Sequence, residues 1–289
     1  MSLWASHFEA VHFWQMTSME KAEQTPAREL YDPAFYDRQS SASERSARQI
    51  LPLLLELIDI QSAVDVGCGV GPWLAVLESI GIDDYLGIDG DYVDRDKLRI
   101  APSRFHGADL THPLRLGRKF DLVLCLEVAE HLPEAAAPTL VQSLCALGDV
   151  VLFSAAIPFQ LGIHHINLRW PDYWAGLFAQ QSYACVDCLR RRVWTNKNVS
   201  WWYAQNAILY VRQSVVPACP KLAALGDVVG AAPLPLVHPT NYEWIGAGMK
   251  RLRDLTDAPD VRQAGATFAK SIGASVSRRI GLSPNRPAR

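Results

Sequence analysis

Val64-Asp65-Val66-Gly67-Cys68-Gly69-Val70-Gly71 is the stretch of sequence that decides the fold of this chain. Apolar residues around one acid predict a buried strand, and glycines at alternate positions predict a tight turn directly after it. Pro72 then opens a helix, because proline suits the first helical position. Since glycine has no Cβ atom to hold a ligand away from the backbone, this turn is suited to close contact with a ligand.

The acid before the turn favours one class of ligand over another. The carboxylate of Asp65 would repel a pyrophosphate, whereas it could pair with a cationic amino-acid group. A dinucleotide-binding turn also needs a small residue where this chain has Pro72. The turn therefore favours S-adenosylmethionine over NAD. The cofactor-binding residues expected here are Asp65, Gly67, Cys68, Gly69, Gly71 and Trp73.

Further acids stand at the ends of the next predicted strands. Residues 85–88 read as a second strand that ends on Asp89, where a carboxylate can hold ribose hydroxyls. Asp109 follows the next strand and could accept a hydrogen bond from an adenine amino group. A fourth strand over 120–126 leads into a run of acids and a histidine. The cofactor-binding residues expected along this part are Asp89, Gly90, Ala108, Asp109, Leu110 and Glu127.

Strands and helices alternate from residue 63 onward, which predicts an α/β fold with a doubly wound, mostly parallel sheet. The other elements expected are a helix over 43–58, a strand over 150–156, a helix over 171–180, and strands over 184–193 and 207–211. We expect a hairpin-like loop to join the last two strands.

The order of these motifs resembles the class I S-adenosylmethionine-dependent methyltransferases. The D-V-G-C-G-V-G turn, Asp89, the Ala108-Asp109-Leu110 segment and the F-D-L-V strand carry the resemblance, which covers about residues 30 to 213. It implies a Rossmann-like sheet of seven strands that ends in an antiparallel pair. The expected domains are an N-terminal extension over 1–28 that could act as a lid, the S-adenosylmethionine-binding methyltransferase domain over 29–213, and a Pro-rich linker with a C-terminal helical extension over 214–289.

A second cluster of polar residues follows the fourth and fifth strands. Glu127, Glu130 and His131 would share one face of a helix that begins there. His164 and His165 follow the fifth strand, and open α/β sheets bind ligands at this carboxyl edge. Two roles stay open. His131 could act as general base, with Glu130 and His164 as further catalytic candidates. Alternatively, the carboxylates and imidazoles could bind a divalent metal that lowers the pKa of a hydroxyl.

The E-x-x-E-H pattern with a later histidine is similar to the metal site of the small-RNA terminal 2′-O-methyltransferases. That resemblance implies that Glu127, Glu130, His131 and His165 hold Mg²⁺ or Mn²⁺, with His164 as the substitute if the register shifts. The same block also resembles ubiquinone-type O-methyltransferases. Glu-His-Leu at this place is common in class I methyltransferases with or without a metal.

The acceptor is indicated only by surrounding residues. Residues 164–174 resemble uncharacterised bacterial methyltransferases of glycan and natural-product pathways. Aromatic side chains in the loop over 194–206 suit a sugar ring or a planar acceptor. The polar side chains expected to contact a hydroxylated acceptor are Asn167, Arg169, Gln205 and Asn206.

The composition of the chain limits the classes of molecule that it is expected to bind. The chain has 289 residues, a formal net charge of −2 and a pI of about 6.4, which argues against nucleic acid because its binding needs a basic surface. No apolar run reaches the roughly 18 residues of a membrane span, and the N-terminus lacks signal-peptide features. The six cysteines read as reduced thiols, which predicts a cytoplasmic protein. A homodimer is a candidate assembly.

The leading hypothesis is methyl transfer to a hydroxyl of a sugar, glycan or glycosylated metabolite. One alternative is a phenolic or amine natural product that is methylated without a metal. Another alternative is methylation of RNA. A further one is a nicotinamide oxidoreductase, which Asp65 and Pro72 disfavour. A cofactor-binding scaffold without turnover is the alternative from outside the enzymes.

Overall fold

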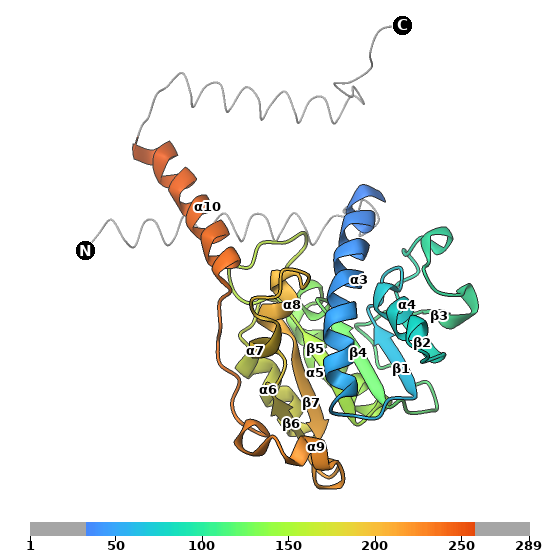
Figure 1. The fold of residues 1–289 in the computed structure, drawn as a ribbon. Coiled ribbons are helices and arrows are strands. Elements are labelled where there is room, and N and C mark those ends of the chain that lie inside the picture. Colours follow the sequence, from blue (N-terminus) through green and yellow to red (C-terminus); the bar gives the residue numbers. More distant parts are fainter. Residues whose placement is uncertain (1–32, 258–289) are drawn as a thin grey trace, which may run out of the picture. The chain divides into compact units, whose positions relative to one another are not determined.

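A sheet of seven strands in the order β3-β2-β1-β4-β5-β7-β6 organises the first part of the chain (Figure 1). The computed structural model describes residues 33–257, so the extension expected over 1–28 lies outside them. The strands are β1 Ser62–Val66, β2 Asp84–Asp89, β3 Phe105–Gly107, β4 Leu122–Leu126, β5 Val150–Ser154, β6 Tyr183–Val186 and β7 Ile208–Arg212. In this sheet β7 pairs antiparallel with both β5 and β6, and the other pairs of strands are parallel. The expected fold class and its antiparallel ending are confirmed.

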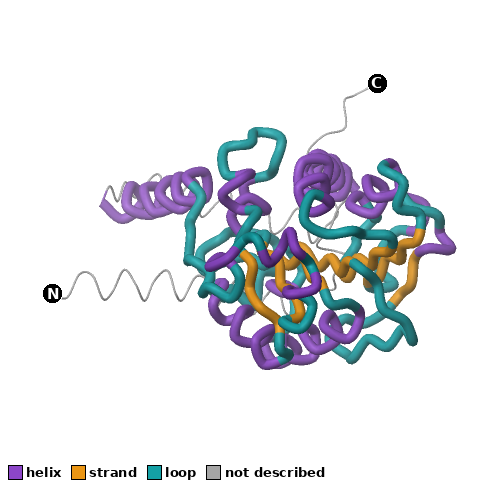
Figure 2. Tube along the Cα trace, turned by 60° about the horizontal axis from the view of Figure 1, so that its bottom comes forward, coloured by secondary structure: helices purple, strands orange, loops and turns teal. Residues whose placement is uncertain are grey.

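Helices lie on both sides of the sheet, as the purple and orange segments of Figure 2 show. They are α3 Pro33–Leu55, α4 Pro72–Ser79, α5 Ala137–Leu147, α6 Pro171–Gln180, α7 Arg190–Val193, α8 Trp201–Asn206, α9 Pro220–Ala223 and α10 Pro239–Asp257. Prolines occupy the first position of α4 and α6, where the missing N–H would have no helical partner. Both helices begin where the sequence predicts them.

Alternate residues of the central strands face two different apolar cores. Leu122 and Leu124 of β4 pack in one cluster with side chains from α3 and α4, whereas Val123 and Cys125 pack in the other with side chains from α5 and α6. This follows from the two-residue period of a strand that is covered on both faces. Burial of each large apolar side chain contributes about 1.5–3 kcal/mol to the free energy of unfolding. Together they fix the carboxyl edge of the sheet, where the polar residues lie.

Three of the expected elements are wrong in extent or type. The helix expected over 43–58 begins at Pro33 and ends at Leu55. The strand expected over 184–193 ends at Val186, because the buried Arg190 turns inward to Asp187 and to the carbonyl of Leu234 from the short helix α7. The loop expected over 194–206 contains α8.

The chain divides into two compact units, Met1–Asn241 and Tyr242–Arg289. The first unit carries the sheet, and the described part of the second is the body of α10, on which Tyr242, Trp244 and Met249 are exposed. The second C-terminal helix expected over 261–280 lies outside the described residues. Among residues 33–257 we find no helix with the length and apolar content that crossing a membrane requires.

Candidate active site

The glycine turn after β1 leaves open space above the carboxyl edge of the sheet. Gly67 and Gly69 have φ angles of 85° and 54°, in the left-handed region that glycine adopts without strain. A Cβ atom on Gly67 would lie 2.2 Å from Cγ2 of Val128, so this turn packs tightly against the residues after β4. A Cβ atom on Gly69 would meet no described atom within 4 Å. The turn is therefore closed on one side and open at Gly69.

Asp89 holds this turn in place from the end of β2. Its Oδ2 accepts a hydrogen bond from the N–H of Gly69 at 2.7 Å. Its Oδ1 accepts from the N–H of Gly90 at 2.7 Å and from the hydroxyl of Tyr92 at 2.6 Å. Its carbonyl accepts from the N–H of Ala108 at 2.8 Å, which ties the residue after β3 to the same place. A carboxylate here can still accept from a ribose hydroxyl through its remaining lone pairs.

Asp65 is a buried carboxyl group without a hydrogen-bond donor among residues 33–257. Its side chain is 3% exposed, and it makes no hydrogen bond or ion pair with the described chain. Burial, together with the charge of Asp89, raises the pKa of Asp65 to about 8. A buried acid of this kind beside an open turn fits a ligand that brings a positive charge. The observation fits the amino group of S-adenosylmethionine.

The other residues expected to bind the cofactor differ in their exposure. The ring of Trp73 is buried against Tyr203, with centroids 5.3 Å apart, and Cys68 and Leu110 are buried too. Asp109 is exposed, and its Oδ1 accepts hydrogen bonds from the N–H and hydroxyl of Thr111 at 2.9 and 2.7 Å. These bonds lower the pKa of Asp109. Its contact with an adenine amino group stays a prediction.

The turn after β4 differs from the expected helix. Glu127 has a left-handed backbone with a φ of 56°, and a single 3₁₀ turn follows over Ala129–His131. The N–H of Glu127 donates to the carbonyl and hydroxyl oxygens of Ser154 on β5, each at 3.0 Å. These bonds hold Glu127 against the neighbouring strand, so no α-helix starts there. The expectation of three side chains on one helix face is therefore wrong.

The tight turn nevertheless brings three polar side chains together. Ligand atoms of Glu130, His131 and His165 all lie within 4.8 Å of one another. The imidazole rings of His131 and His165 meet edge to face, with centroids 4.9 Å apart. Glu130 is fully buried, and by geometry neither of its carboxylate oxygens accepts a hydrogen bond from the described chain, although the nearby backbone N–H groups of Glu130 and Ala156 favour its ionised form. Burial and the neighbouring Glu127 raise the pKa of Glu130 well above its usual range.

The protons of both histidines are positioned by the backbone. Nδ1 of His131 lies 3.1 Å from the carbonyl oxygen of His164, and Nδ1 of His165 lies 3.1 Å from that of Gln160. A carbonyl oxygen only accepts, so each Nδ1 carries the hydrogen and each Nε2 carries a lone pair. Burial lowers the pKa of His131 to about 3 and that of His165 to about 4. Both rings are neutral near pH 7, the form in which imidazole binds a metal.

His164 takes a different place from its neighbour. Its backbone is left-handed, with a φ of 57°, and its carbonyl oxygen faces His131. Its Nδ1 is buried without a hydrogen-bond partner in the described part of the chain, and it is not part of the trio formed by Glu130, His131 and His165. The arrangement supports His165 over His164 as the later histidine of a metal site.

The family model of the methyltransferase domain matches residues 34–203, which is more than half of the chain. The chain belongs to this methyltransferase domain family. The match includes the glycine turn, Asp89 and the turn after β4, so the expected class of enzyme is confirmed. No curated protein matches the chain. The roles of the individual site residues stay predictions.

Solved structures with a similar fold include three from bacteria. DesVI of Streptomyces venezuelae is 16% identical, with 65% of this chain and 99% of that chain covered and a TM-score of 0.49. Magnesium protoporphyrin IX methyltransferase of Synechocystis PCC 6803, with bound SAH, is 16% identical over 68% and 94%, with a TM-score of 0.45. An O-methyltransferase family protein of Burkholderia thailandensis is 14% identical over 71% and 70%, with a TM-score of 0.48. At these identities they leave the acceptor of this chain open.

The methyltransferase domain also contains a buried amide network that no sequence pattern indicates. Gln160, Gln205 and Asn206 are 3%, 0% and 4% exposed, and their side chains bond to one another. The acceptor contact expected for Gln205 and Asn206 stays a prediction. Nε2 of Gln160 and Nδ2 of Asn206 donate to the two carboxylate oxygens of Glu127, at 3.1 and 3.0 Å. Nε2 of Gln205 donates to Oε1 of Gln160 at 2.9 Å.

The orientation of Gln205 is imposed from the chain beyond β7. The backbone N–H of His238 and Nδ2 of Asn241 both donate to Oε1 of Gln205, at 2.9 and 3.2 Å. The amide nitrogen of Gln205 must therefore point to Gln160, whose own nitrogen then points to Glu127. The amide network therefore presents only N–H donors, from Gln160 and Asn206, to the carboxylate of Glu127. It favours the ionised form of that carboxyl group and opposes the effect of its burial, which raises its pKa.

Replacing Gln205 by glutamate is expected to lower the free energy of unfolding by about 2–3 kcal/mol. The new carboxylate would face the side-chain oxygens of Gln160 and Asn206, and it has no hydrogen to donate. Urea unfolding of the wild type and the variant measures the change. Gln49→Glu is the matched control, because Oε1 of Gln49 accepts from Asn196 and the substitution keeps that acceptor. An equal loss of stability in both variants would contradict the directional amide network.

Proposed function

We propose that this methyltransferase transfers a methyl group from S-adenosylmethionine to a hydroxyl oxygen, and that Glu130, His131 and His165 hold Mg²⁺ or Mn²⁺ at that hydroxyl. The observation that carries the proposal is the convergence of these three side chains within 4.8 Å, one of them a fully buried carboxyl group without a donor. A metal ion bound there would lower the pKa of the acceptor hydroxyl. Glu127 lies next to Glu130 and completes the set that the resemblance implies.

The donor side of the proposal rests on the glycine turn. The carboxylate of Asp65 would pair with the amino group of the donor's methionine part, and that of Asp89 would accept from its ribose hydroxyls. Gly69 would admit the donor, because a Cβ atom built there meets no described atom within 4 Å. Holding donor and acceptor in line is the larger task of the protein, since the sulfonium methyl group is already activated.

The pKa of His131 favours metal binding over general-base catalysis. A general base works best when the pKa of its protonated form lies near the working pH. Burial lowers the pKa of His131 to about 3, so its ring would be a poor acceptor for the proton of a hydroxyl. The same neutral ring is a good metal ligand through Nε2. Methylation of a phenol or amine without a metal is therefore the less favoured function.

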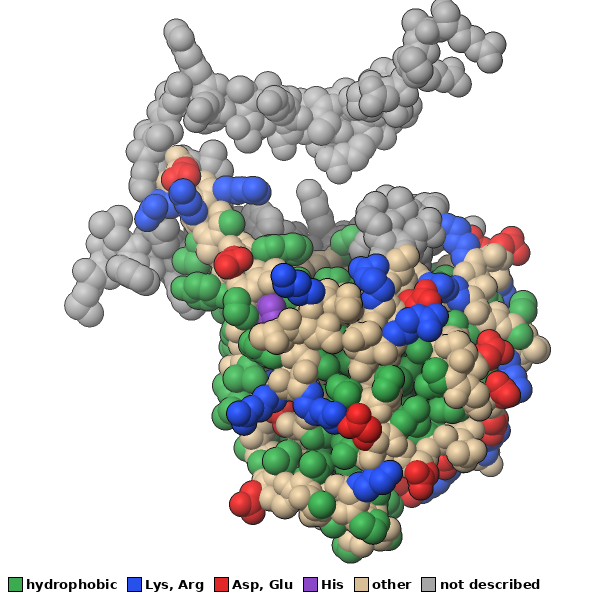
Figure 3. All heavy atoms as spheres, in the orientation of Figure 1, with side chains coloured by type: hydrophobic (Ala, Val, Ile, Leu, Met, Phe, Trp, Pro, Cys, Tyr) green, Lys and Arg blue, Asp and Glu red, His purple; other side chains and the backbone are tan. Residues whose placement is uncertain are grey.

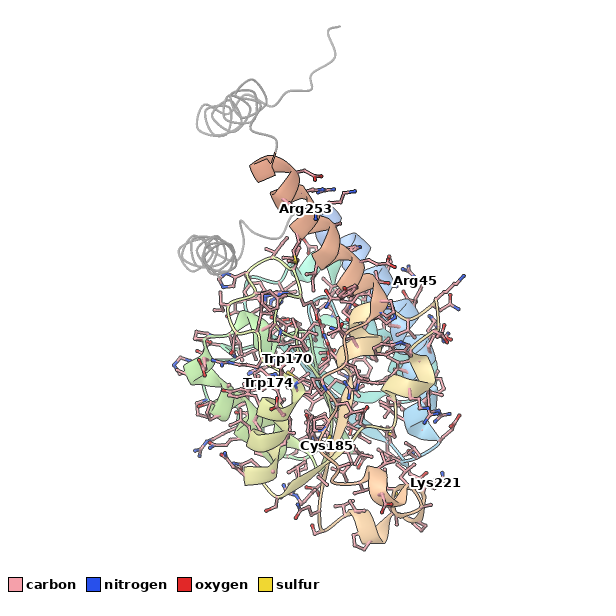
Figure 4. All side chains as sticks on the ribbon, turned by 90° about the vertical axis from the view of Figure 1, so that its left-hand side faces the viewer. Arg45, Trp170, Trp174, Cys185, Lys221 and Arg253 are labelled. Carbon is pink, nitrogen blue, oxygen red and sulfur yellow. The ribbon has the colours of Figure 1, made fainter. Side chains whose placement is uncertain are left out.

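A sugar, glycan or glycosylated metabolite is the acceptor that we propose. Trp170 stands at the start of α6, where Figure 4 labels it, and with 37% exposure it offers an aromatic face to a sugar ring. Trp174 one turn later is buried and has no such role. On the face drawn in Figure 3, acidic and basic side chains are interspersed. That mixture does not favour the phosphate backbone of RNA.

Titration calorimetry of Mn²⁺ into the protein saturated with S-adenosylhomocysteine tests the metal site. We expect micromolar binding in the wild type and none in His165→Ala. His106→Ala is the control, because His106 is an exposed histidine on β3 outside the trio. Methyl transfer to a panel of sugars with vicinal hydroxyls then tests the activity. Absence of Mn²⁺ binding in the wild type would remove the metal from the proposal.

Gly162→Ala is expected to weaken Mn²⁺ binding by about tenfold or more. A Cβ atom at Gly162 would lie 2.1 Å from Cε1 and Nε2 of His165, so the imidazole has to move. Because ligand geometry decides affinity, a displaced Nε2 binds less well. Gly176→Ala is the matched control, since a Cβ atom there meets no described atom within 4 Å. In the middle of α6 it should stabilise the protein by about 0.5–1 kcal/mol and leave the calorimetric affinity unchanged.

A further inference from the structure

The segment between β5 and α6 exposes apolar side chains at the metal site proposed above. Phe159, Leu161 and Ile163 are 43%, 55% and 40% exposed. Residues 157–168 contain no lysine, arginine, aspartate or glutamate. Exposed large apolar residues that stand together in one segment mark contact sites more often than single ones do.

Contacts of the same segment place its backbone beside the two histidines. The backbone of Gly162 lies directly against the Cε1–Nε2 edge of His165. Leu161 and Ile163 are the chain neighbours of Gly162, and both side chains are exposed. Nδ1 of His131 bonds to the carbonyl oxygen of His164, the residue after Ile163. An acceptor with its hydroxyl at Nε2 of His165 would therefore lie against the stretch of backbone that carries both apolar residues.

The backbone of this segment is held in a fixed shape. Phe159 and His164 have left-handed φ angles of 67° and 57°, which side chains with a Cβ atom adopt only under constraint. Gln160 supplies the constraint between them, because its side chain bonds to Glu127 and Gln205 and its carbonyl oxygen accepts from His165. Strained backbone that is held by its surroundings is typical of sites that present side chains to a ligand.

We propose that Leu161 and Ile163 bind an apolar aglycone of the acceptor, next to the hydroxyl that is methylated. This inference rests on the proposed function and narrows it to a glycoside with an alkyl or aryl group. A free sugar would leave both side chains exposed to water, whereas an apolar group would bury them. RNA is disfavoured, because no cation of this segment could meet a phosphate.

The test compares octyl and methyl β-D-glucopyranoside as probes, below the concentration at which the octyl compound forms micelles. Calorimetric titration into the protein saturated with S-adenosylhomocysteine and Mn²⁺ gives a ratio of two affinities. We expect the octyl compound to bind about tenfold more tightly, which corresponds to burial of roughly two methylene groups. The ratio should fall towards one in the double variant Leu161→Ser, Ile163→Ser. Ile80→Ser, at an exposed residue after α4, should keep it.

Each outcome separates the inference from the proposed function. Equal binding of the two probes, no binding of either, or a ratio that survives in the double variant would overturn the apolar contact. Methyl transfer to glycosides with no preference for the octyl compound would leave the proposed function standing without the inference. Tight octyl binding that needs Leu161 and Ile163, with no methyl transfer to any glycoside, would keep the contact and refute the proposed acceptor.

Discussion

Glu130→Gln is expected to abolish Mn²⁺ binding and at the same time to stabilise the protein. The carboxyl group of Glu130 is fully buried, and no N–H or O–H group of the described chain bonds to its oxygens. Glutamine has the same shape without the charge, and its amide nitrogen can donate to the neighbouring Glu127. We expect the free energy of unfolding to rise by about 1–3 kcal/mol. Methyl transfer should fall by about 10²-fold or more, because a neutral amide is a poor ligand for a divalent metal.

Two measurements on the same variant separate a functional role of Glu130 from a structural one. Urea unfolding in the absence of metal reports stability, and calorimetry with Mn²⁺ reports binding. Glu134→Gln is the matched control, since Glu134 is exposed and pairs with Arg169. It should change both quantities little, as surface ion pairs contribute about 0–1 kcal/mol. Unchanged Mn²⁺ affinity in Glu130→Gln would refute the metal site.

Asp65→Asn is expected to weaken binding of S-adenosylhomocysteine by about 10²-fold while it stabilises the ligand-free protein. The buried carboxylate is the partner that we propose for the ligand's amino group, and pairs with a charged group are worth about 1.5–3 kcal/mol. Without ligand, the same group has no donor in the described chain. We expect the free energy of unfolding at pH 7.5 to rise by about 2–4 kcal/mol. Calorimetry and urea unfolding measure the two effects.

The pH dependence of stability gives Asp65 a signature of its own. Its pKa is about 8 in the folded protein, against 3.8 for an unperturbed aspartate. The folded state therefore holds this proton more tightly, so the contribution of Asp65 to the free energy of unfolding is highest below about pH 4 and falls as the pH rises towards 8. The advantage of Asp65→Asn over the wild type should grow between pH 5 and pH 7.5. Asp59→Asn, at an exposed position, should show no such growth.

Local patterns predict the part of the site that is built from local residues. The glycine turn, Asp65 and Asp89 lie within one strand–turn–helix–strand segment, and their spacing alone indicates a nucleoside ligand. The pairing of the turn after β4 with the histidines after β5 follows from the parallel order of the strands. These contacts need no knowledge of distant side chains.

Other features depend on residues that are far apart in the sequence. The N–H of Glu127 bonds to Ser154, 27 positions along the chain, and this bond keeps Glu127 out of a helix. Helical periodicity carries no information about a contact at that separation. Arg190 ends β6 early because it reaches Leu234, and an isolated C-V-D-C-L-R-R-R-V segment gives no sign of that contact. Gln160 lies in no recognisable sequence motif, so its role in the amide network is not indicated by the sequence. Buried amides are defined by their partners, and sequence gives those partners only when the fold is known.

Two donors to Gln205, from His238 and Asn241, come from beyond the last strand, and this bears on how short a fragment can keep the site intact. The final strand ends at Arg212, yet His238 and Asn241 set the direction of the amide that leads to Glu127. A chain cut after Arg212 would keep every strand of the sheet and still release Gln205 to rotate. The sheet ends at Arg212, whereas the contacts that orient Gln205, and through Gln160 also Glu127, come from His238 and Asn241. A deletion that removes these two residues would therefore change the surroundings of Glu127 without removing a strand.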